Sequence, residues 1–189
     1  MKHLLNFDNL EKKELEKLID ETLKTGTNNI KKINSYSILK FDEGSTRTRL
    51  SFLLAAKKSG IEIAETNDFI SAKSKGEDLQ HEVETYKALG VEILVIRTKE
   101  NNLSDYENIS NLGVISAGFG NSSHPTQALI DISTLEKFQK LDKNIPVTYV
   151  GDLRHSRVFA SGRELLGKLG FKIGVYTSDE LLPNDLRNL

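Results

Sequence analysis

The 189-residue sequence contains no cysteine, no tryptophan, one methionine and three prolines. The lack of cysteine excludes disulfide bonds, thiolate metal sites and cysteine nucleophiles. No apolar run approaches the roughly 20 residues that cross a bilayer, and the first residues lack the apolar centre of a signal peptide. With 26 Lys and Arg against 27 Asp and Glu, the chain lacks the basic surplus of nucleic-acid-binding proteins. We therefore expect a cytoplasmic globular protein without a membrane or nucleic-acid partner.

Short β-branched runs alternate with amphipathic stretches along the chain. The runs typical of strands are residues 35–41, 61–65, 91–97, 114–118, 146–152 and 171–177. The stretches typical of helices are residues 46–59, 77–89, 105–112, 124–140 and 158–169, together with a first helix that follows a capping box of Asp8 and Glu11. Repeated β-α-β units predict an α/β fold, in which a parallel sheet is covered by helices on both faces.

The polar stretch near residue 140 predicts a domain boundary. Residues 1–140 supply four expected strands with crossover helices, which is enough for a closed core, whereas residues 141–189 supply two strands and one helix. Two parallel strands leave apolar edges and one face open. We therefore expect a first domain at 1–140 and an incomplete second α/β domain at 141–189, completed by further chain or by a partner.

The segment FDEGSTRTRLSF, residues 41–52, has the pattern of an anion site. A strand ends there and a helix begins, and the free amides and positive dipole end of a helix's first turn bind anions. The side chains expected to add donors are Ser45, Thr46, Arg47 and Thr48. Arg49 lies about 200° from Arg47 around the helix, so we assign it to a structural ion pair. The alternative is an ordinary capped helix with solvated arginines.

Two further arginines follow predicted strands. Arg97 ends the apolar run VEILVIR, and a charge beside a buried run needs a partner or a ligand. Arg157 lies in GDLRHSR, between a strand and a helix of the second domain, whereas we interpret Arg154 as surface charge. Ligands of open α/β sheets bind at the carboxyl ends of the strands, so Arg97 and Arg157 are candidates for anion binding.

The segment HPTQALID places a histidine and an amide near one helix start. Pro125 suits the first helical position, so His124 lies at the mouth of the helix and Gln127 one turn further along the same face. Together they could hydrogen-bond a carbonyl group, or His124 could merely cap its helix. The polar loop at residues 70–80 could close over a ligand or simply be solvated.

These features are expected at one edge of the sheet. Anion-binding groups follow successive strands at Ser45–Thr48, Arg97 and Arg157, and His124 and Gln127 belong to the same edge. We expect the edge to form a crevice in which the mouth of the helix at residue 46 faces His124. Several cations at one crevice predict a small substrate that carries more than one negative charge.

Five segments occur in the order and at the spacing seen in the aspartate carbamoyltransferases: FDEGSTRTRLSF, SKGEDL, VIRTKE, HPTQALID and GDLRHSRV. STRTR and HPTQ are shared by all carbamoyltransferases, whereas KGE and GDLRHSR resemble the aspartate-using enzymes. The chain resembles the N-terminal part of the family's catalytic subunit, which predicts a C-terminally shortened sequence. Phe119 departs from the family pattern, because AGFG here replaces AGDG.

The resemblance implies transfer of the carbamoyl group of carbamoyl phosphate to the amine of L-aspartate, in pyrimidine biosynthesis, with no metal and no organic cofactor. The implied carbamoyl phosphate ligands are Ser45, Thr46, Arg47, Thr48, Arg97, His124 and Gln127. The implied catalytic residues among them are Arg47, Thr48, Arg97 and His124. The implied aspartate ligands are Arg157, Ser71 and Lys75. Ser71 and Lys75 would enter the site of a neighbouring subunit, because the family forms homotrimers with shared active sites.

Two other interpretations stay open at this point. The chain could be a truncated, non-catalytic paralogue that binds carbamoyl phosphate or assembles with full-length chains. It could also be a carbamoyltransferase with another amine acceptor, since much of the acceptor pocket lies in the part of the family's chain that this sequence does not cover. Association with regulatory chains, and activity of this chain alone, are left open as well.

Overall fold

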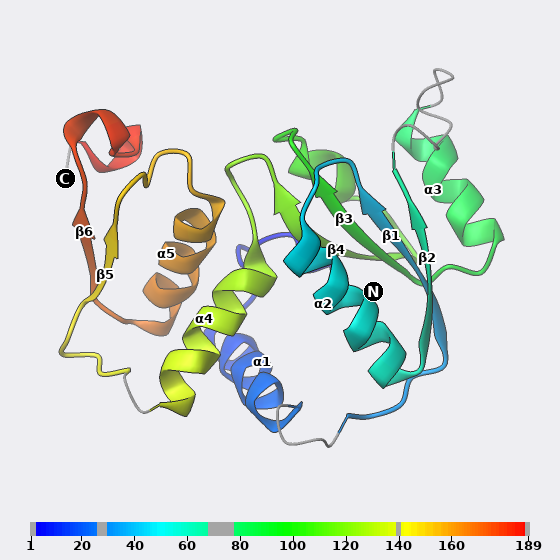
Figure 1. Cartoon of the computed structure of the whole chain (residues 1–189), viewed down its shortest axis with the longest axis horizontal. Helices are drawn as coiled ribbons and strands as arrows, with labels where there is room; N and C mark the ends of the chain where they lie inside the picture. The colour runs from blue at the N-terminus through cyan, green and yellow to red at the C-terminus, as the bar shows by residue number, and fades with distance from the viewer. Residues whose placement is uncertain (1–2, 26–29, 68–77, 139–140, 188–189) are drawn as a thin grey trace. The chain divides into compact units, whose positions relative to one another are not determined.

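The computed structural model describes residues 3–25, 30–67, 78–138 and 141–187. The chain separates into two compact units. Unit 1 comprises residues 1–5 and 30–119, and unit 2 comprises residues 6–29 and 120–189. Figure 1 labels the helices and strands of both units.

Unit 1 is built on a four-stranded parallel sheet in the order β2-β1-β3-β4. Its strands are β1 (Ser35–Phe41), β2 (Ile61–Thr66), β3 (Ile93–Thr98) and β4 (Gly113–Phe119). Its helices are α2 (Thr46–Ser59), α3 (Leu79–Ala88) and a 3-10 helix (Leu103–Tyr106). The predicted parallel sheet is therefore confirmed.

Both faces of this sheet are covered. Leu39 and Val95 face α2, where Phe52 packs against them. Their chain neighbours Ile38 and Leu94 face the opposite way, into a core that α3 and the 3-10 helix close. Successive side chains of a strand point to opposite faces, so the central strands bury apolar side chains on both sides. This arrangement explains why the run at residues 91–97 is nearly continuous in apolar character.

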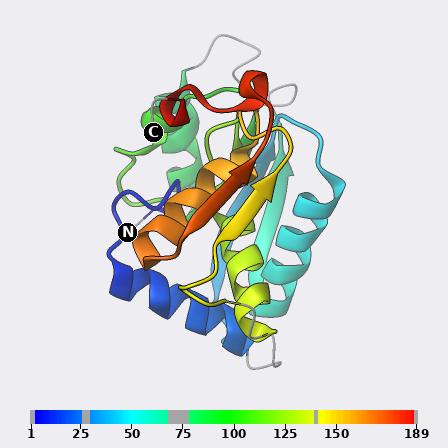
Figure 2. The same cartoon turned by 90° about the vertical axis from the view of Figure 1, so that its left-hand side faces the viewer.

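In its described residues, unit 2 combines three α-helices and two 3-10 helices (Asp179–Leu181 and Asn184–Leu186) with a two-stranded parallel sheet. The helices α1 (Lys12–Thr25), α4 (Pro125–Lys137) and α5 (Arg157–Leu169) pack on one another. The strands β5 (Val147–Val150) and β6 (Ile173–Tyr176) lie side by side in front of α5 in Figure 2. Val150 and Tyr176 are 70% and 75% exposed, so the expectation of two strands with an open apolar face is confirmed.

The two units do not follow the expected division at residue 140. Helices α1 and α4 are grouped with the second sheet because they pack on α5 and on each other. The domain assignment 1–140 and 141–189 concerns function as well as packing, and it stays a prediction. No helix in the described part of the chain is long and apolar enough to cross a membrane, and the cytoplasmic location also stays a prediction.

Two local predictions are wrong. The capping box does not pair Asp8 with Glu11, because α1 begins later and the Glu14 carboxylate accepts from Glu11 N at 3.0 Å. The helix expected at residues 105–112 is a single 3-10 turn that ends at Tyr106. The chain then turns through Asn111, whose φ of 60° is left-handed, a conformation that interrupts a right-handed helix and that asparagine tolerates.

Candidate active site

The predicted anion donors belong to the N-terminus of α2, the helix that follows β1 in the chain and is labelled in Figure 1. Ser45 is the N-cap residue, with an extended backbone (φ −159°, ψ 98°), and its side chain makes no capping hydrogen bond. The hydrogen bond from Arg49 N to Ser45 O, at 3.0 Å, closes the first turn, so the earlier N–H groups have no acceptor within the helix. Thr46 and Arg47 are exposed. The helix start can therefore receive an anion.

Arg47 and Arg49 differ in their partners. The Arg49 guanidinium binds the Glu65 carboxylate through two of its nitrogens, with Nη2 at 2.8 Å from Oε1. Among the described residues, none forms a side-chain hydrogen bond or an ion pair with the Arg47 guanidinium. The assignment of Arg49 to a structural ion pair is confirmed, and Arg47 is the cation left for a ligand.

Arg97 lies beside the turn that leads into α2. It pairs in register with Phe41 across β1 and β3, and its carbonyl accepts from Asp42 N at 2.9 Å. Its side chain is 9% exposed; Nη1 donates to Ala117 O at 3.0 Å, and Nη2 lies 3.3 Å from Glu43 Oε2. Unit 1 therefore brings Arg97 and the start of α2 to one edge of its sheet, and the expected partner of the buried charge is Glu43.

In unit 2, His124 lies at the N-cap of α4 and Pro125 at the start of the helix, as predicted. His124 is 5% exposed. Its backbone N donates to Ser161 Oγ of α5 at 2.8 Å, and its ring Nδ1 lies 3.4 Å from Thr126 Oγ1. The imidazole makes no capping hydrogen bond, so His124 occupies the N-cap position without capping α4 through its side chain, and its role in binding stays a prediction.

Gln127 lies on the first turn of α4 and contacts an acid one turn further on. Its Nε2 donates to Asp131 Oδ1 at 2.9 Å. Burial raises the pKa of the Asp131 carboxyl, and the hydrogen bond from Gln127 offsets part of that rise. The Gln127 amide and the Asp131 carboxylate are therefore hydrogen-bonded to each other on α4, on the C-terminal side of His124.

Arg157 is the first residue of α5, whose N-cap Ser156 accepts from Phe159 N at 3.1 Å. The Arg157 Nη1 donates to Gly120 O at 2.9 Å. Gly120 belongs to the segment that leads to His124, so this hydrogen bond ties the start of α5 to the chain before α4. Unit 2 thus holds Arg157 and the α4 start on neighbouring helices.

In the same segment GDLRHSR, the charged or titratable residues Asp152, Arg154 and His155 are exposed. Arg154 Nη1 lies 3.4 Å from Glu180 O, in agreement with its assignment to the surface. His155 Nδ1 lies 3.0 Å from Asp152 Oδ2, and the hydrogen bonds from His155 lower the pKa of the Asp152 carboxyl. The predicted ligands Ser71 and Lys75 lie outside the described residues.

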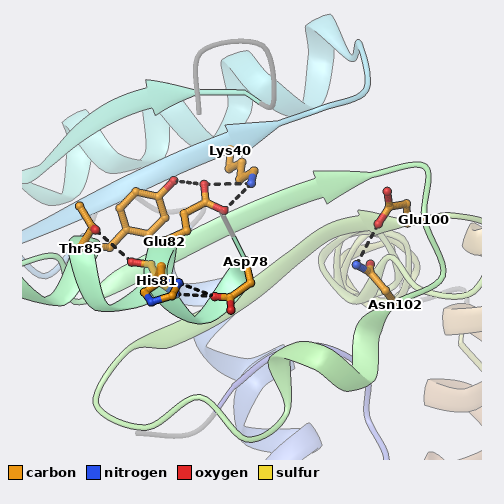
Figure 3. A network of polar contacts seen from close by, with 8 residues as sticks. Lys40, Asp78, His81, Glu82, Thr85, Glu100 and Asn102 are labelled. Atoms are coloured by element: carbon orange, nitrogen blue, oxygen red, sulfur yellow. Dashed lines mark hydrogen bonds and ion pairs between the residues drawn. The ribbon is translucent and has the colours of Figure 1, made fainter. Parts of the chain in front are cut away.

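Sequence reasoning missed the carboxylates that hold the polar side chains in place. Besides Glu43 and Asp131, unit 1 buries Glu82 against Lys40, whose Nζ lies 2.7 and 2.9 Å from the two carboxylate oxygens (Figure 3). The Tyr86 hydroxyl donates to Glu82 Oε1 at 2.6 Å, and burial together with Glu82 raises the pKa of Tyr86. A lysine inside the apolar run SYSILKF was the available signal, since a buried cation requires an acid.

Phe119, the departure from the family pattern, is fully buried at the end of β4. Its ring meets that of Tyr106 in an edge-to-face arrangement, with the centroids 5.2 Å apart. The aromatic residue therefore fills the core of unit 1 at this position.

Comparison with known proteins gives a consistent result. The family model described as "Aspartate/ornithine carbamoyltransferase, carbamoyl-P binding domain" matches residues 2–137. The aspartate carbamoyltransferase catalytic subunit of Coxiella burnetii (strain RSA 493) is 38% identical, and that of Aquifex aeolicus is 36% identical. Both alignments cover 98% of this chain but 63% and 65% of the relatives. The chain thus spans less than two thirds of the length of these relatives.

Solved structures give the same picture. The catalytic subunit of M. jannaschii aspartate transcarbamoylase is 30% identical with a TM-score of 0.78, over 98% of this chain and 63% of that one. Aspartate transcarbamoylase of Trypanosoma cruzi, in complex with N-(phosphonacetyl)-L-aspartic acid, is 26% identical with a TM-score of 0.80, over 97% and 62% of the two chains. Since the family model covers most of a sequence whose STRTR and HPTQ segments begin two helices as the motifs predict, this chain belongs to the aspartate/ornithine carbamoyltransferase family.

Proposed function

We propose that this chain binds carbamoyl phosphate and takes part in transferring its carbamoyl group to the amine of L-aspartate. The products are N-carbamoyl-L-aspartate and phosphate, in de novo pyrimidine biosynthesis. One observation carries the proposal: Arg47, without an ion-pair partner among the described residues, lies in the open first turn of α2, at the sheet edge where Arg97 lies near the end of β3. The matched family model, a carbamoyl-P binding domain, supports it.

The phosphate of the substrate is assigned to the start of α2. The first-turn amides and the positive end of the helix dipole favour an anion there. Ser45, Thr46 and Thr48 supply hydroxyl donors, and the planar guanidinium of Arg47 can bind two phosphate oxygens at once. Arg97 is assigned to both the phosphate and the carbonyl oxygen, since a guanidinium carries five N–H donors and this one lies beside the turn that leads into α2.

The carbamoyl group is assigned to Arg97, Thr48, His124 and Gln127. The amine of aspartate attacks the carbamoyl carbon, a C–N bond forms, and negative charge develops on the carbonyl oxygen. When the bond between the carbonyl carbon and the bridging phosphate oxygen breaks, the electron pair leaves with phosphate, and the amine loses a proton. Preorganised donors to the carbonyl oxygen stabilise the intermediate state, each by about 3–4 kcal/mol.

Aspartate is assigned to Arg157, which would bind a carboxylate, and to Ser71 and Lys75 of a neighbouring subunit. The proposed assembly is a homotrimer whose active sites are shared between subunits. Holding two anions together against their repulsion is itself a large part of such catalysis. Arg157 supports this assignment because it is a half-buried cation at the start of α5, where the hydrogen bond from its Nη1 to Gly120 O holds the guanidinium in place.

Carbamoyl transfer is tested by measuring product formation with L-aspartate and with L-ornithine as the acceptor. We expect carbamoyl aspartate and no citrulline, because KGE and GDLRHSR are the segments of the aspartate-using enzymes. Citrulline as the main product would favour the other-acceptor interpretation. Binding of carbamoyl phosphate without any product would favour the non-catalytic paralogue.

The shared site is tested by mixing Arg47→Ala chains with Lys75→Ala chains, each in a background that contains the complete catalytic chain. Neither variant alone is expected to be active. Hybrid trimers contain sites in which Arg47 comes from one subunit and Lys75 from its neighbour, so partial activity should return on mixing. A mixture as inactive as its parents would contradict the shared-site assignment.

A further inference from the structure

The hydrogen bond between Gln127 and Asp131 fixes the direction of an amide. An ionised carboxylate only accepts hydrogen bonds, whereas an amide has a donating NH₂ end and an accepting oxygen. Because Gln127 Nε2 donates to Asp131 Oδ1 at 2.9 Å, the NH₂ end is turned to Asp131. Oε1 is thereby kept as the acceptor of this side chain for any other partner.

Among the described residues, the Asp131 carboxylate has no binding partner other than Gln127. Within that part of the chain it forms no ion pair with a cation, and the Gln127 amide is its one hydrogen-bond partner. Burial raises the pKa of the Tyr149 phenol in β5 to about 12, and the charge of Asp131 contributes to that rise. A partly buried carboxylate without a cation is costly, so its presence is better explained by the amide that it orients than by stability.

We propose that Asp131 is a specificity-determining positioning residue, which orients Gln127 so that Oε1 accepts a hydrogen bond from the NH₂ group of carbamoyl phosphate. The inference rests on the proposed function, in which Gln127 binds the carbamoyl group. It adds the reason for selecting that group: acetyl phosphate has the same shape but a methyl group in place of NH₂, and cannot donate. A flipped amide would turn its own NH₂ toward the ligand's NH₂ and lose the selection.

The test is calorimetric titration of carbamoyl phosphate, acetyl phosphate and inorganic phosphate into the present chain and its variants. For Asp131→Leu we expect the preference for carbamoyl over acetyl phosphate to fall about five- to tenfold, the worth of one hydrogen bond. Affinity for inorganic phosphate should not change. Glu136→Leu removes an exposed acid from the same helix and should leave all three affinities at the wild-type values.

A double variant shows whether Asp131 acts through Gln127. If it does, the Gln127→Leu/Asp131→Leu chain loses no more of the preference than Gln127→Leu alone, because the two changes remove one interaction. Equal weakening of all three ligands by Asp131→Leu would overturn the proposal and leave Asp131 a structural residue. A wild-type chain that binds none of the ligands would instead contradict the proposed function.

A measurement on the unaltered chain covers the case in which Asp131→Leu does not fold. Nuclear magnetic resonance of the side-chain amides should show Gln127 exchanging its N–H protons at least several-fold more slowly than the exposed Gln80. The Gln127→Leu spectrum identifies the signal. Exchange of Gln127 as fast as that of Gln80 would show that the amide is not held and would overturn the proposal.

Discussion

Unit 1 covers both faces of its sheet with its own helices, whereas unit 2 leaves one face of its two strands exposed. In unit 1, Arg97 lies near the end of β3 and the start of α2 follows β1, and both strands are buried on both sides. In unit 2, His124 and Arg157 stand at the starts of α4 and α5, and helix-to-helix packing holds them. The residues predicted to bind the substrate are therefore supported by a sheet in one unit and by helix packing in the other.

The two units also differ in how they bury acids. Glu82 in unit 1 has a cation and a phenol on its two oxygens. Glu164 in unit 2 accepts from Phe7 N at 2.9 Å, while the nearby Lys168 directs its ammonium to the carbonyl oxygens of Phe7 and Asp8. Burial, followed by the charge of Asp8, raises the pKa of Glu164 to about 7. The buried carboxylate Glu82 of unit 1 therefore has a cationic partner, whereas Glu164 of unit 2 has a backbone N–H as its hydrogen-bond donor.

The largest loss of stability is expected when the buried ion pair of Lys40 and Glu82 is broken. Lys40→Met leaves Glu82 buried without a cation, which should lower the free energy of unfolding by about 3–5 kcal/mol. The double change Lys40→Met/Glu82→Leu removes both charges and should recover much of that loss. Urea denaturation followed by circular dichroism measures both. A double variant as unstable as Lys40→Met would show that packing, and not the unpaired charge, sets the cost.

A smaller difference in stability is expected between substitutions in β3, whose faces are both covered, and in β5, which has one exposed face. Ile96 is fully buried in β3, and Ile96→Ala should cost about 2–5 kcal/mol through lost burial and a cavity. Val150 of β5 is 70% exposed, so Val150→Ala should change the free energy of unfolding by no more than about 0.5 kcal/mol. Comparable losses in the same urea experiment would mean that the outer face of β5 is covered in solution.

The smallest effect concerns Glu164 and depends on pH. The folded state raises its pKa from 4.5 to about 7, so the folded chain holds a proton that the unfolded chain releases between these values. Stability from this group is present below pH 4.5 and is lost as the pH rises through 7. Relative to Glu164→Gln, the wild type should lose about 1–2 kcal/mol between roughly pH 5 and 8, after allowance for partial exposure. Parallel stability curves for the two proteins would contradict the raised pKa.

The sequence predicted the bounds of helices and strands better than the partners of charged side chains. The strand at residues 35–41 and the helix at 46–59 were expected with the bounds that β1 and α2 have, because apolar alternation and Gly60 mark their limits. The ion pair of Arg49 followed from helix geometry alone. The pairing of Lys40 with Glu82 spans 42 residues, and that of Arg97 with Glu43 joins different elements. Such contacts depend on the register of β1 against β3 and on the seating of α3, which local patterns do not specify.

The same limit explains the failures near the chain start and in the site. Asp8, Glu11 and Glu14 all have the chemistry of capping residues, and only the tertiary structure decides that α1 begins at Lys12. The spacing of His124 and Gln127 predicted that they share a helix start. It did not predict that Asp131 would accept a hydrogen bond from the Gln127 NH₂ group. That contact depends on the rotamers of both side chains, which are set by their burial in the fold.

The central claim is that the start of α2 binds the phosphate of carbamoyl phosphate through Arg47. Calorimetric titration of carbamoyl phosphate into the wild-type, Arg47→Ala and Arg49→Ala chains tests it most directly, since the two variants remove the same side chain from positions two residues apart. The account predicts that Arg47→Ala abolishes measurable binding and that Arg49→Ala, which loses only the exposed ion pair with Glu65, keeps it. An Arg47→Ala chain that binds carbamoyl phosphate with the wild-type affinity would contradict the account.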